Sequence, residues 1–385
     1  MSVRVLHVIT RLSLGGAAEN TVASMVGLAT AGYGGPLAVG RAASDPESLE
    51  DAERRGVTLI DVAAFGREIG PRDVLALVQL LAIIRRERPG IVHTHTSKAG
   101  FLGRLAAQLA RVPAVIHQPH GHVFYGYYGR GLTSVYSTLE RLAARWTDRI
   151  ITLTERGTAE HLARRIGHAA QYRTVPSGVP TAELRFRAPN RAAARASLGV
   201  PANAFVIAGL GRLEPVKGFD VLIRALPAIV AAIPTAQVVL VGEGTERGAL
   251  EAQAAALGIG ERVRVTGATA DVARWLAASD VLAAPSRNEG MGRALVEAMA
   301  LGIPVVAAAV GGIPAVVSDG QSGRLVPSED AGALAKAVIE LGGDEALCAK
   351  LAAAAARHAE AFSIGVANTA MRAIYDELVR EKRLR

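Results

Sequence analysis

The sequence predicts an α/β protein with two doubly wound domains, each built on a parallel sheet that helices cover on both faces. Short apolar runs rich in β-branched residues alternate with longer helical patterns, which is typical of βαβ units. The strand-like runs are apolar almost throughout, as expected for strands that are buried on both faces. The length of 385 residues favours two hydrophobic cores over one.

The alternation is regular over residues 1–180, which we take as the first domain. Its predicted strands are residues 3–9, 37–39, 91–94, 114–118 and 149–154. Its predicted helices are residues 19–31, 71–88, 99–110 and 134–144.

A linker is predicted at residues 181–201, where four arginines stand among alanines, and the alternation then restarts. The second domain, residues 202–362, has predicted strands at residues 205–209, 237–241, 263–265, 281–284, 304–308 and 323–326. The closing segment, residues 363–385, has an amphipathic helical pattern that begins after the second domain's last helix. We expect this helix to cross back to the first domain.

Cysteine content and hydropathy indicate a cytoplasmic protein. The single cysteine, Cys348, cannot form an intrachain disulfide framework. The apolar run at residues 3–9 is too short for the core of a signal peptide. The longest apolar candidate for a membrane span, within residues 73–85, is too short to cross a bilayer.

The positive charge lies in the first half of the chain. Residues 1–190 hold 23 Lys and Arg against 15 Asp and Glu, whereas residues 191–385 hold 20 of each. This asymmetry favours an anionic partner for the first domain: a membrane surface, a phosphorylated acceptor or nucleic acid. A GC-rich coding bias toward arginine is the alternative explanation.

The first chemical motif follows the strand predicted at residues 205–209. Gly211 gives a tight turn, and Arg212 and Lys217 place two cations near the carboxyl end of a parallel strand, where α/β proteins bind ligands. Arginine offers a bidentate fork and lysine a compact charge, which suits a departing diphosphate. Two cations in a loop are also typical of an ordinary solvated surface.

The second motif is a glycine loop between a strand and a helix, residues 285–300. Gly290 and Gly292 let backbone amides approach a ligand, and the helix that follows points its positive dipole end at the same place. Glu289 lies in the loop, and Glu297 lies on an otherwise apolar helix, where a carboxylate needs a partner. The hydroxyls of a ribose would serve, and so would an arginine within the fold.

Together with Gly311-Gly312-Ile313-Pro314, these motifs resemble the retaining glycosyltransferase family 4 of GT-B fold, of the kind that builds bacterial cell-surface glycans and glycolipids. In the first domain, Gly15 and Gly16 are similar to the family's N-terminal glycine loop, and His120 follows a strand where the family often has a histidine. The likeness covers essentially the whole chain.

The resemblance implies a role for each matching residue. Arg212 and Lys217 would hold the diphosphate, with Gly211 in the same loop, and Glu297 would hold the ribose. Glu289 would bind the donor sugar with the backbone amides of Met291 and Gly292, and Gly290, Gly15 and Gly16 would complete the donor site. His120 would touch the donor sugar near its reacting carbon. The chain departs from the family at Met291, where an aromatic residue is usual, and at Ala315, where a glutamate is usual.

The implied reaction is the transfer of a hexose, with retention of anomeric configuration, from a nucleotide diphosphate sugar. UDP is the first expectation for the nucleotide and GDP the second. No Asp-x-Asp sequence occurs in the chain, and we expect neither a metal ion nor another cofactor. The acceptor is expected to be a lipid-linked or other cell-envelope glycan, with the enzyme held at the inner face of the membrane.

Three features of the first domain bear on the acceptor. Ser97 and Lys98 begin a predicted helix, where an anion would be attracted, although ordinary helix capping is the alternative. Tyr125 and Tyr127 belong to an aromatic, glycine-rich segment that suits an acceptor or membrane-interface loop, or plain packing. Metal binding by His93 and His95 is not expected, on the premise that their side chains face opposite sides of a strand.

Three other functions were weighed. A nicotinamide-dependent dehydrogenase should carry Gly-x-Gly-x-x-Gly, but Gly209 and Gly211 are followed by Glu214. A nucleotide-sugar 2-epimerase would share the architecture and isomerise its sugar without an acceptor. Nucleic-acid binding is suggested only by the basic first half and is not expected.

Overall fold

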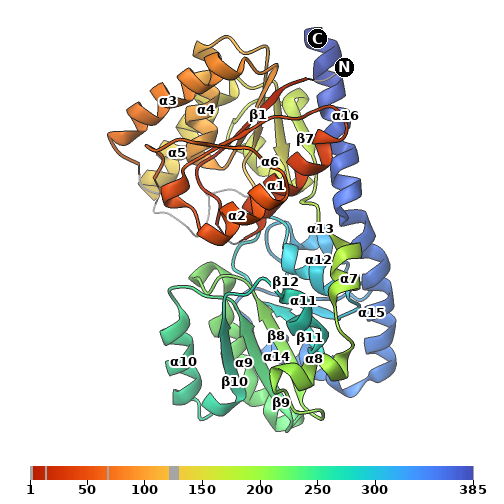
Figure 1. The fold of residues 1–385 in the computed structure, drawn as a ribbon. Coiled ribbons are helices and arrows are strands. Elements are labelled where there is room, and N and C mark those ends of the chain that lie inside the picture. The colour runs from red at the N-terminus through yellow and green to blue at the C-terminus, as the bar shows by residue number, and fades with distance from the viewer. Residues whose placement is uncertain (1–2, 14, 67–68, 121–129, 385) are drawn as a thin grey trace. The chain divides into compact units, whose positions relative to one another are not determined.

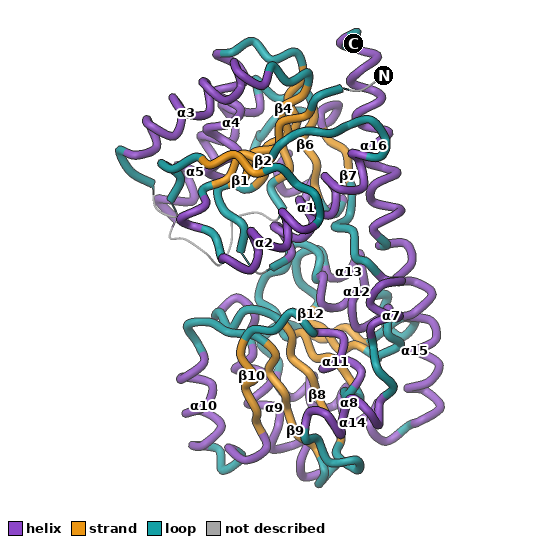
Figure 2. The backbone as a smooth tube through the Cα atoms, viewed as in Figure 1, coloured by secondary structure: helices purple, strands orange, loops and turns teal. Residues whose placement is uncertain are grey.

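The computed structural model describes residues 3–13, 15–66, 69–120 and 130–384. The chain divides into two compact units (Figure 1). The first comprises residues 1–178 and 364–385, and the second comprises residues 179–363. Figure 2 shows that the strands of each unit gather into a sheet of their own. The described part of the chain contains no helix that is both long enough and apolar enough to cross a bilayer.

The described strands of the first unit form one parallel sheet in the order β3-β2-β1-β4-β5-β6-β7. They are β1 (Val5–Ile9), β2 (Leu37–Val39), β3 (Leu59–Asp61), β4 (Ile91–His95), β5 (Ala114–Gln118), β6 (Arg149–Thr152) and β7 (Tyr172–Thr174). The strand order reverses between β1 and β4, so the sheet is doubly wound. The predicted α/β fold is therefore confirmed for this unit.

Helices cover both faces of this sheet because strand side chains alternate between two apolar cores. Leu6 and Val8 of β1 pack with α3 and α4, whereas Val5 packs with α1 and α16. The helices are α1 (Gly16–Ala29), α2 (Pro46–Arg54), α3 (Arg72–Glu87), α4 (Ser97–Leu109), α5 (Arg130–Ala144), α6 (Glu155–Ala163) and α16 (Ile364–Lys382). Helix α16 belongs to this unit because Met371 and Tyr375 are buried in its core.

The second unit repeats the architecture with the parallel strand order β10-β9-β8-β11-β12-β13 among the described residues. The strands are β8 (Phe205–Leu210), β9 (Ala236–Val241), β10 (Val263–Gly267), β11 (Val281–Ala284), β12 (Val305–Ala308) and β13 (Arg324–Val326). The strand order reverses between β8 and β11, and α/β sheets bind ligands at such a switch point. The two units together confirm the GT-B type of fold, with two Rossmann-like domains.

Along the sequence, the helices of the second unit alternate with its strands, and further helices precede the first strand and follow the last one. They are α7 (Thr181–Arg187), α8 (Arg191–Leu198), α9 (Phe219–Ala232), α10 (Arg247–Ala256), α11 (Val272–Ala277), α12 (Arg293–Ala300), α13 (Ile313–Val316), α14 (Ala331–Gly343) and α15 (Glu345–Ala359). The turn η3 (Pro215–Lys217) links β8 to α9. The main core includes Leu222 and Ile229 of α9, which pack with Val338 of α14.

Residues 181–201, predicted as a linker, fold as α7 and α8 within the second unit. Asn190 caps α8 by accepting a hydrogen bond from the backbone amide of Ala193 at 2.9 Å. Arg195 is buried and donates to Asp280 at 2.7 Å, which fastens α8 to the start of β11. Arg195 suggested a solvated linker because its acidic partner, Asp280, lies 85 positions further along the chain.

A buried ion pair joins α4 to α5 in the first unit. One guanidinium nitrogen of Arg104 donates to both carboxylate oxygens of Glu140, each at 2.7 Å, and the Arg104 Nε donates to the Gly100 carbonyl oxygen at 2.7 Å. Arg104 is fully buried, so Glu140 is the group that compensates its charge.

We expect Glu140→Ala to lower the free energy of unfolding by about 3–5 kcal/mol, because removal of one partner leaves a buried charge uncompensated. The matched control is Glu251→Ala, which breaks an exposed ion pair with Arg247 on α10 and should leave stability nearly unchanged. Urea unfolding followed by circular dichroism measures both effects. Equal unfolding midpoints for the two variants would contradict the assignment.

Candidate active site

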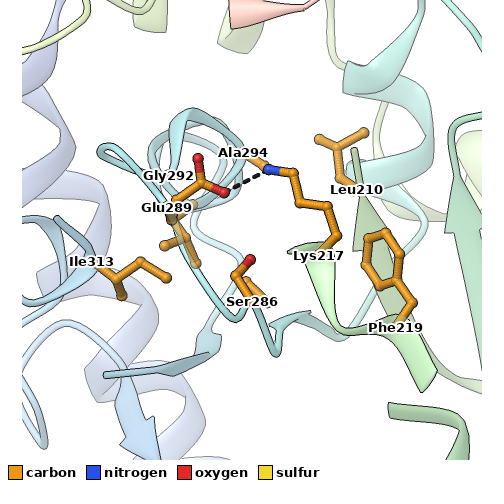
Figure 3. A pocket seen from close by; sticks show the side chains of 10 residues that line it. Leu210, Lys217, Phe219, Ser286, Glu289, Gly292, Ala294 and Ile313 are labelled. Carbon is orange, nitrogen blue, oxygen red and sulfur yellow. Dashed lines mark hydrogen bonds and ion pairs between the residues drawn. The ribbon is translucent and has the colours of Figure 1, made fainter. Parts of the chain in front are cut away.

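The candidate site lies at the carboxyl ends of β8 and β11, on the two sides of the switch point in the second sheet. The chain leaves β8 at Leu210 and forms the turn η3, and it leaves β11 at Ala284 and reaches α12 through residues 285–292. A small pocket lies between these two loops (Figure 3). Its lining residues are Leu210, Lys217, Phe219, Ala284, Ser286, Glu289, Gly292, Ala294, Leu295 and Ile313.

Two of the predicted site residues meet at the pocket. The Lys217 ammonium donates to a carboxylate oxygen of Glu289 at 2.5 Å, and Figure 3 shows the two side chains pointing toward each other. The side chains are only 23% and 20% exposed, so their interaction is less screened than a surface pair. The fold thus places an ammonium and a carboxylate together at the rim of one pocket.

Two glycines of the motifs are required by close backbone contacts. Gly218 has a positive φ of 65°, and a Cβ there would lie 2.1 Å from the carbonyl oxygen of Pro285. Gly311 has a φ of 51°, and a Cβ there would lie 2.1 Å from the carbonyl oxygen of Glu289. The amide of Gly312 also donates to that oxygen at 2.8 Å. The Gly311-Gly312 motif therefore acts by holding the backbone of Glu289.

Arg287 fastens the two loops to each other, and the sequence analysis did not identify it. Its guanidinium donates to both carboxylate oxygens of Asp220 at 2.8 Å and to the carbonyl oxygen of Pro215 at 2.5 Å. Its backbone amide donates to Val216 at 2.8 Å, and Glu329 is a further ion-pair partner. The hydrogen bonds to Asp220 raise the pKa of Arg287. Burial would raise the pKa of Asp220, but the Arg287 guanidinium holds it below its usual value.

Helix α12 begins beside the pocket. Gly292 precedes it with a φ of 88°, and Met291 is buried with only 2% of its surface exposed. Glu297 accepts a hydrogen bond from the Arg293 guanidinium at 2.9 Å. The arginine partner that the sequence left as an alternative for Glu297 is therefore present one helical turn away.

Arg212 and the loop after β9 lie beside each other at the carboxyl end of β8, next to the pocket-lining segment but not among the lining residues. The Arg212 side chain is exposed, and no described carboxylate forms an ion pair with it. The amide of Leu213 donates to the carbonyl oxygen of Glu243 at 2.9 Å, so the loop at residues 242–245 lies against the loop that carries Arg212. The sequence analysis missed this loop, although Gly242 and Gly244 directly after a strand were an available signal.

The predicted residues of the first unit lie in separate places. Gly15 and Gly16 stand at the start of α1, and Ser97 and Lys98 begin α4. The Lys98 ammonium donates to Asp73 of α3 at 2.7 Å, and its side chain is only 9% exposed. The Lys98 ammonium, considered in the sequence analysis as part of an anion site, is therefore held in an ion pair within the first unit. Tyr125 and Tyr127 lie outside the described residues.

His120 follows β5 and adopts a left-handed backbone conformation with a φ of 57°. Its Nε2 lies 2.8 Å from His95 Nδ1, and burial lowers its pKa to about 3. The premise that His93 and His95 face opposite sides was wrong, because residues two apart on a strand share a face. Their ring centroids are 4.3 Å apart.

Two family models match the chain. The family described as "Glycosyl transferases group 1" matches residues 190–358, and the family described as "Glycosyltransferase Family 4" matches residues 26–183. A D-inositol 3-phosphate glycosyltransferase of Streptomyces avermitilis is 35% identical over 320 residues, which are 77% of this chain and 68% of that protein. A UDP-Gal:alpha-D-GlcNAc-diphosphoundecaprenol alpha-1,3-galactosyltransferase of Escherichia coli is 30% identical over 279 residues, 72% of each chain.

Solved structures show the same fold. The crystal structure of Anabaena HepE in complex with UDP-glucose has a TM-score of 0.83 and 23% sequence identity, covering 97% of this chain and 100% of that one. WaaG, a glycosyltransferase involved in lipopolysaccharide biosynthesis, has a TM-score of 0.74 and 18% identity, covering 95% of this chain and 99% of that one. At these identities the likeness concerns the fold alone.

We expect Arg287→Ala to lower the free energy of unfolding by about 2 kcal/mol or more, because it removes several hydrogen bonds between charged groups. The matched control is Arg224→Ala, since Arg224 contacts the same two carboxylates, Asp220 and Glu329, but from an exposed position on α9. The control variant should lose much less free energy of unfolding. Thermal unfolding compares the two variants, and an equal loss in both would show that Arg287 has no special role.

Proposed function

The chain belongs to glycosyltransferase family 4 and is a glycosyltransferase of GT-B fold, and we propose that it transfers a hexose from a UDP-sugar to a lipid-linked cell-envelope glycan, with retention of anomeric configuration. One observation carries the donor half of this proposal. Lys217 and Glu289 meet at a pocket on the switch point of the second sheet, beside the start of α12. GDP is the second candidate for the nucleotide.

The charges around the pocket suit a nucleoside diphosphate. Arg212 is exposed and Lys217 lines the pocket, and both follow the carboxyl end of β8. Gly292 and the first amides of α12 face the same region, where a helix N-terminus favours phosphate. A solved neighbour is a complex with UDP-glucose, and one relative is named for UDP-Gal, which supports UDP as the first choice.

The proposed reaction breaks the bond between the anomeric carbon and the diphosphate oxygen and forms a bond from that carbon to an acceptor hydroxyl oxygen. The acceptor proton passes to an oxygen of the departing diphosphate on the same face of the sugar, so UDP leaves with the bonding pair. Arg212 and Lys217 stabilise the charge that develops on the diphosphate. Glu289 orients the Lys217 ammonium and can accept a hydrogen bond from a sugar hydroxyl.

We propose that this reaction requires no metal ion, because the two cations at the pocket serve the role of a bound metal toward the diphosphate. The proposal is supported by the lack of Asp-x-Asp in the sequence. Glu297 is proposed to bind the ribose hydroxyls while Arg293 orients its carboxylate at 2.9 Å.

The acceptor half of the proposal is supported by one face of the first unit, which we call the α3–α5 face. On helix α3 three large apolar residues are exposed to solvent: Val74 (69% exposed), Leu75 (53%) and Val78 (58%). The helix ends with two exposed arginines, Arg85 and Arg86. Helix α4 packs against α3 on one side and against α5 on the other, so the three helices are neighbours (Figure 1). Exposed residues of α4 and α5 include Leu109, Arg141, Leu142 and Arg145, and we count them with this face.

Exposed apolar side chains beside arginines match the chemistry of an anionic bilayer surface. The apolar groups enter the headgroup region, and the guanidinium groups pair with lipid phosphates. One relative is named for an acceptor linked to diphosphoundecaprenol, which is a lipid. We therefore propose reversible docking of the α3–α5 face on the membrane that holds the acceptor.

For the donor site, we expect Lys217→Ala and Arg212→Ala each to lower kcat on the order of 100-fold, as commonly follows the loss of one preorganised charge donor. Lys336→Ala, an exposed lysine on α14, is the matched control and should keep full activity. Release of UDP from UDP-glucose or UDP-galactose in the presence of membrane extract measures turnover.

EDTA should not change the rate, and free isomerised UDP-sugar in place of transfer would indicate an epimerase.

For the membrane face, we expect the purified chain to sediment with phosphatidylglycerol vesicles at low salt and to dissociate at high salt. The double variant Arg85→Ser/Arg86→Ser should bind about 30-fold more weakly, because each basic residue near an anionic surface contributes about 1 kcal/mol. The control is Arg262→Ser/Arg274→Ser, which removes two exposed arginines from the second unit. Absence of binding at every ionic strength would favour a soluble acceptor.

A further inference from the structure

Three histidines form a hydrogen-bonded chain inside the first unit. His7 Nδ1 lies 3.0 Å from His95 Nε2, and His95 Nδ1 lies 2.8 Å from His120 Nε2. His7 comes from β1, His95 ends β4, and His120 follows β5, so three parallel strands contribute one residue each. His7 and His95 are almost completely buried.

Burial favours the neutral form of all three imidazoles. Burial lowers the pKa of His7 and of His120 to about 3 and holds the pKa of His95 well below its usual value. In a neutral imidazole one nitrogen donates a hydrogen bond and the other accepts one. A chain of such rings therefore has a direction, and the group at one end decides the tautomer of every ring.

The direction is set from the backbone at Gly178. Its amide donates to Asn20 Oδ1 at 3.0 Å, which turns the Asn20 amide nitrogen, a donor, toward His120 Nδ1 at 3.5 Å. His120 Nδ1 is then the accepting nitrogen. The Thr21 hydroxyl donates to the Ala17 carbonyl oxygen at 2.8 Å, so it does not donate to His120 Nε2, 3.4 Å away, and that nitrogen can carry the proton.

Both contacts assign the proton of His120 to Nε2. His120 Nε2 consequently donates to His95 Nδ1, and His95 Nε2 donates to His7 Nδ1. The chain ends at His7 Nε2, a buried nitrogen without a hydrogen-bond partner among the described residues. A buried unpaired N–H costs about 1–3 kcal/mol, so the arrangement is retained at the expense of stability.

We infer that His95 and His7 are positioning residues that hold His120 in its Nε2–H tautomer and in its left-handed backbone conformation. A positive φ at a non-glycine residue costs about 1–3 kcal/mol and persists only where the surroundings enforce it. The hydrogen bond from His120 to His95 enforces it here. The inference rests on the proposed function together with the contact between His120 and the donor sugar that the family resemblance implies.

Metal binding is the competing explanation of the cluster. One nitrogen from each of His7, His93 and His95 lies within 4.8 Å of the others. His95 already uses both of its nitrogens in the chain, and His93 Nδ1 lies 2.7 Å from the Tyr375 hydroxyl. The hydrogen-bonded chain therefore accounts for more of the contacts.

The tautomers can be read directly by long-range proton–nitrogen NMR of the full chain labelled with ¹⁵N-histidine. We expect His120 and His95 both to carry the proton on Nε2 and to stay neutral from pH 8 to pH 5.5. A proton on His120 Nδ1, a cationic His95 in that range, or nitrogen shifts typical of a bound metal would overturn the inference. This measurement needs no substitution and no activity.

The kinetic test compares three variants. His95→Phe should lower kcat at least 10-fold with little change in KM for the nucleotide sugar, because the donor pocket of the second unit is not altered. His95→Gln should recover part of the rate, since an amide can accept from His120 and donate to His7. His161→Gln is the control. It changes a buried histidine that is hydrogen-bonded to the Gly157 carbonyl oxygen and does not belong to the His7–His95–His120 chain.

The outcomes separate the two proposals. Wild-type kcat in His95→Phe, or no recovery in His95→Gln when both variants fold, would overturn the positioning role. If the wild-type protein transfers no sugar from any nucleotide sugar tested, the proposed function fails. The NMR measurement of the tautomers still tests the hydrogen-bonded histidine chain in that case.

Discussion

The contact between Arg287 and Asp220 is the interaction on which the candidate donor site depends. Parallel strands bring β8 and β11 side by side, but their loops still have to be fixed with respect to each other. Arg287 does this with side-chain bonds to Asp220 and Pro215 and a backbone bond to Val216. Lys217 and Glu289 can pair at 2.5 Å because the segments that carry them are already joined.

The fold was largely predictable because buried parallel strands leave a clear apolar signal. The predicted strands at residues 37–39, 114–118 and 281–284 agree with the structure to the residue. The strands that were missed, β3 and β7, lie at the two edges of the first sheet, and most of their residues are not fully buried. An edge strand contacts one neighbour and is partly exposed, so its sequence need not be continuously apolar.

The site was predictable only where its residues lie in local motifs. Lys217 and Glu289 were found because each stands in a glycine-containing loop after a strand. Arg287 was missed because its meaning depends on Asp220, 67 positions away in the sequence. The same limit applies to the first unit, where His7 and His95 are 88 positions apart and only β-strand pairing brings them into contact. Lys98 looked like a free cation for the same reason, since its partner Asp73 lies on another helix.

The lysine–glutamate pair of the second unit and the histidine chain of the first unit manage polar groups in opposite ways. In the second unit, Lys217 and Glu289 form an ion pair at the pocket, where partial exposure leaves both side chains within reach of a charged ligand. In the first unit, burial suppresses charge on His7, His95 and His120, so only their hydrogen-bond directions remain. A neutral chain of hydrogen-bonded imidazoles can fix the orientation of a side chain. It does so without adding a positive charge that would also attract an anionic nucleotide sugar. On the proposed function, the histidines supply geometry and the lysine–glutamate pair supplies electrostatic binding.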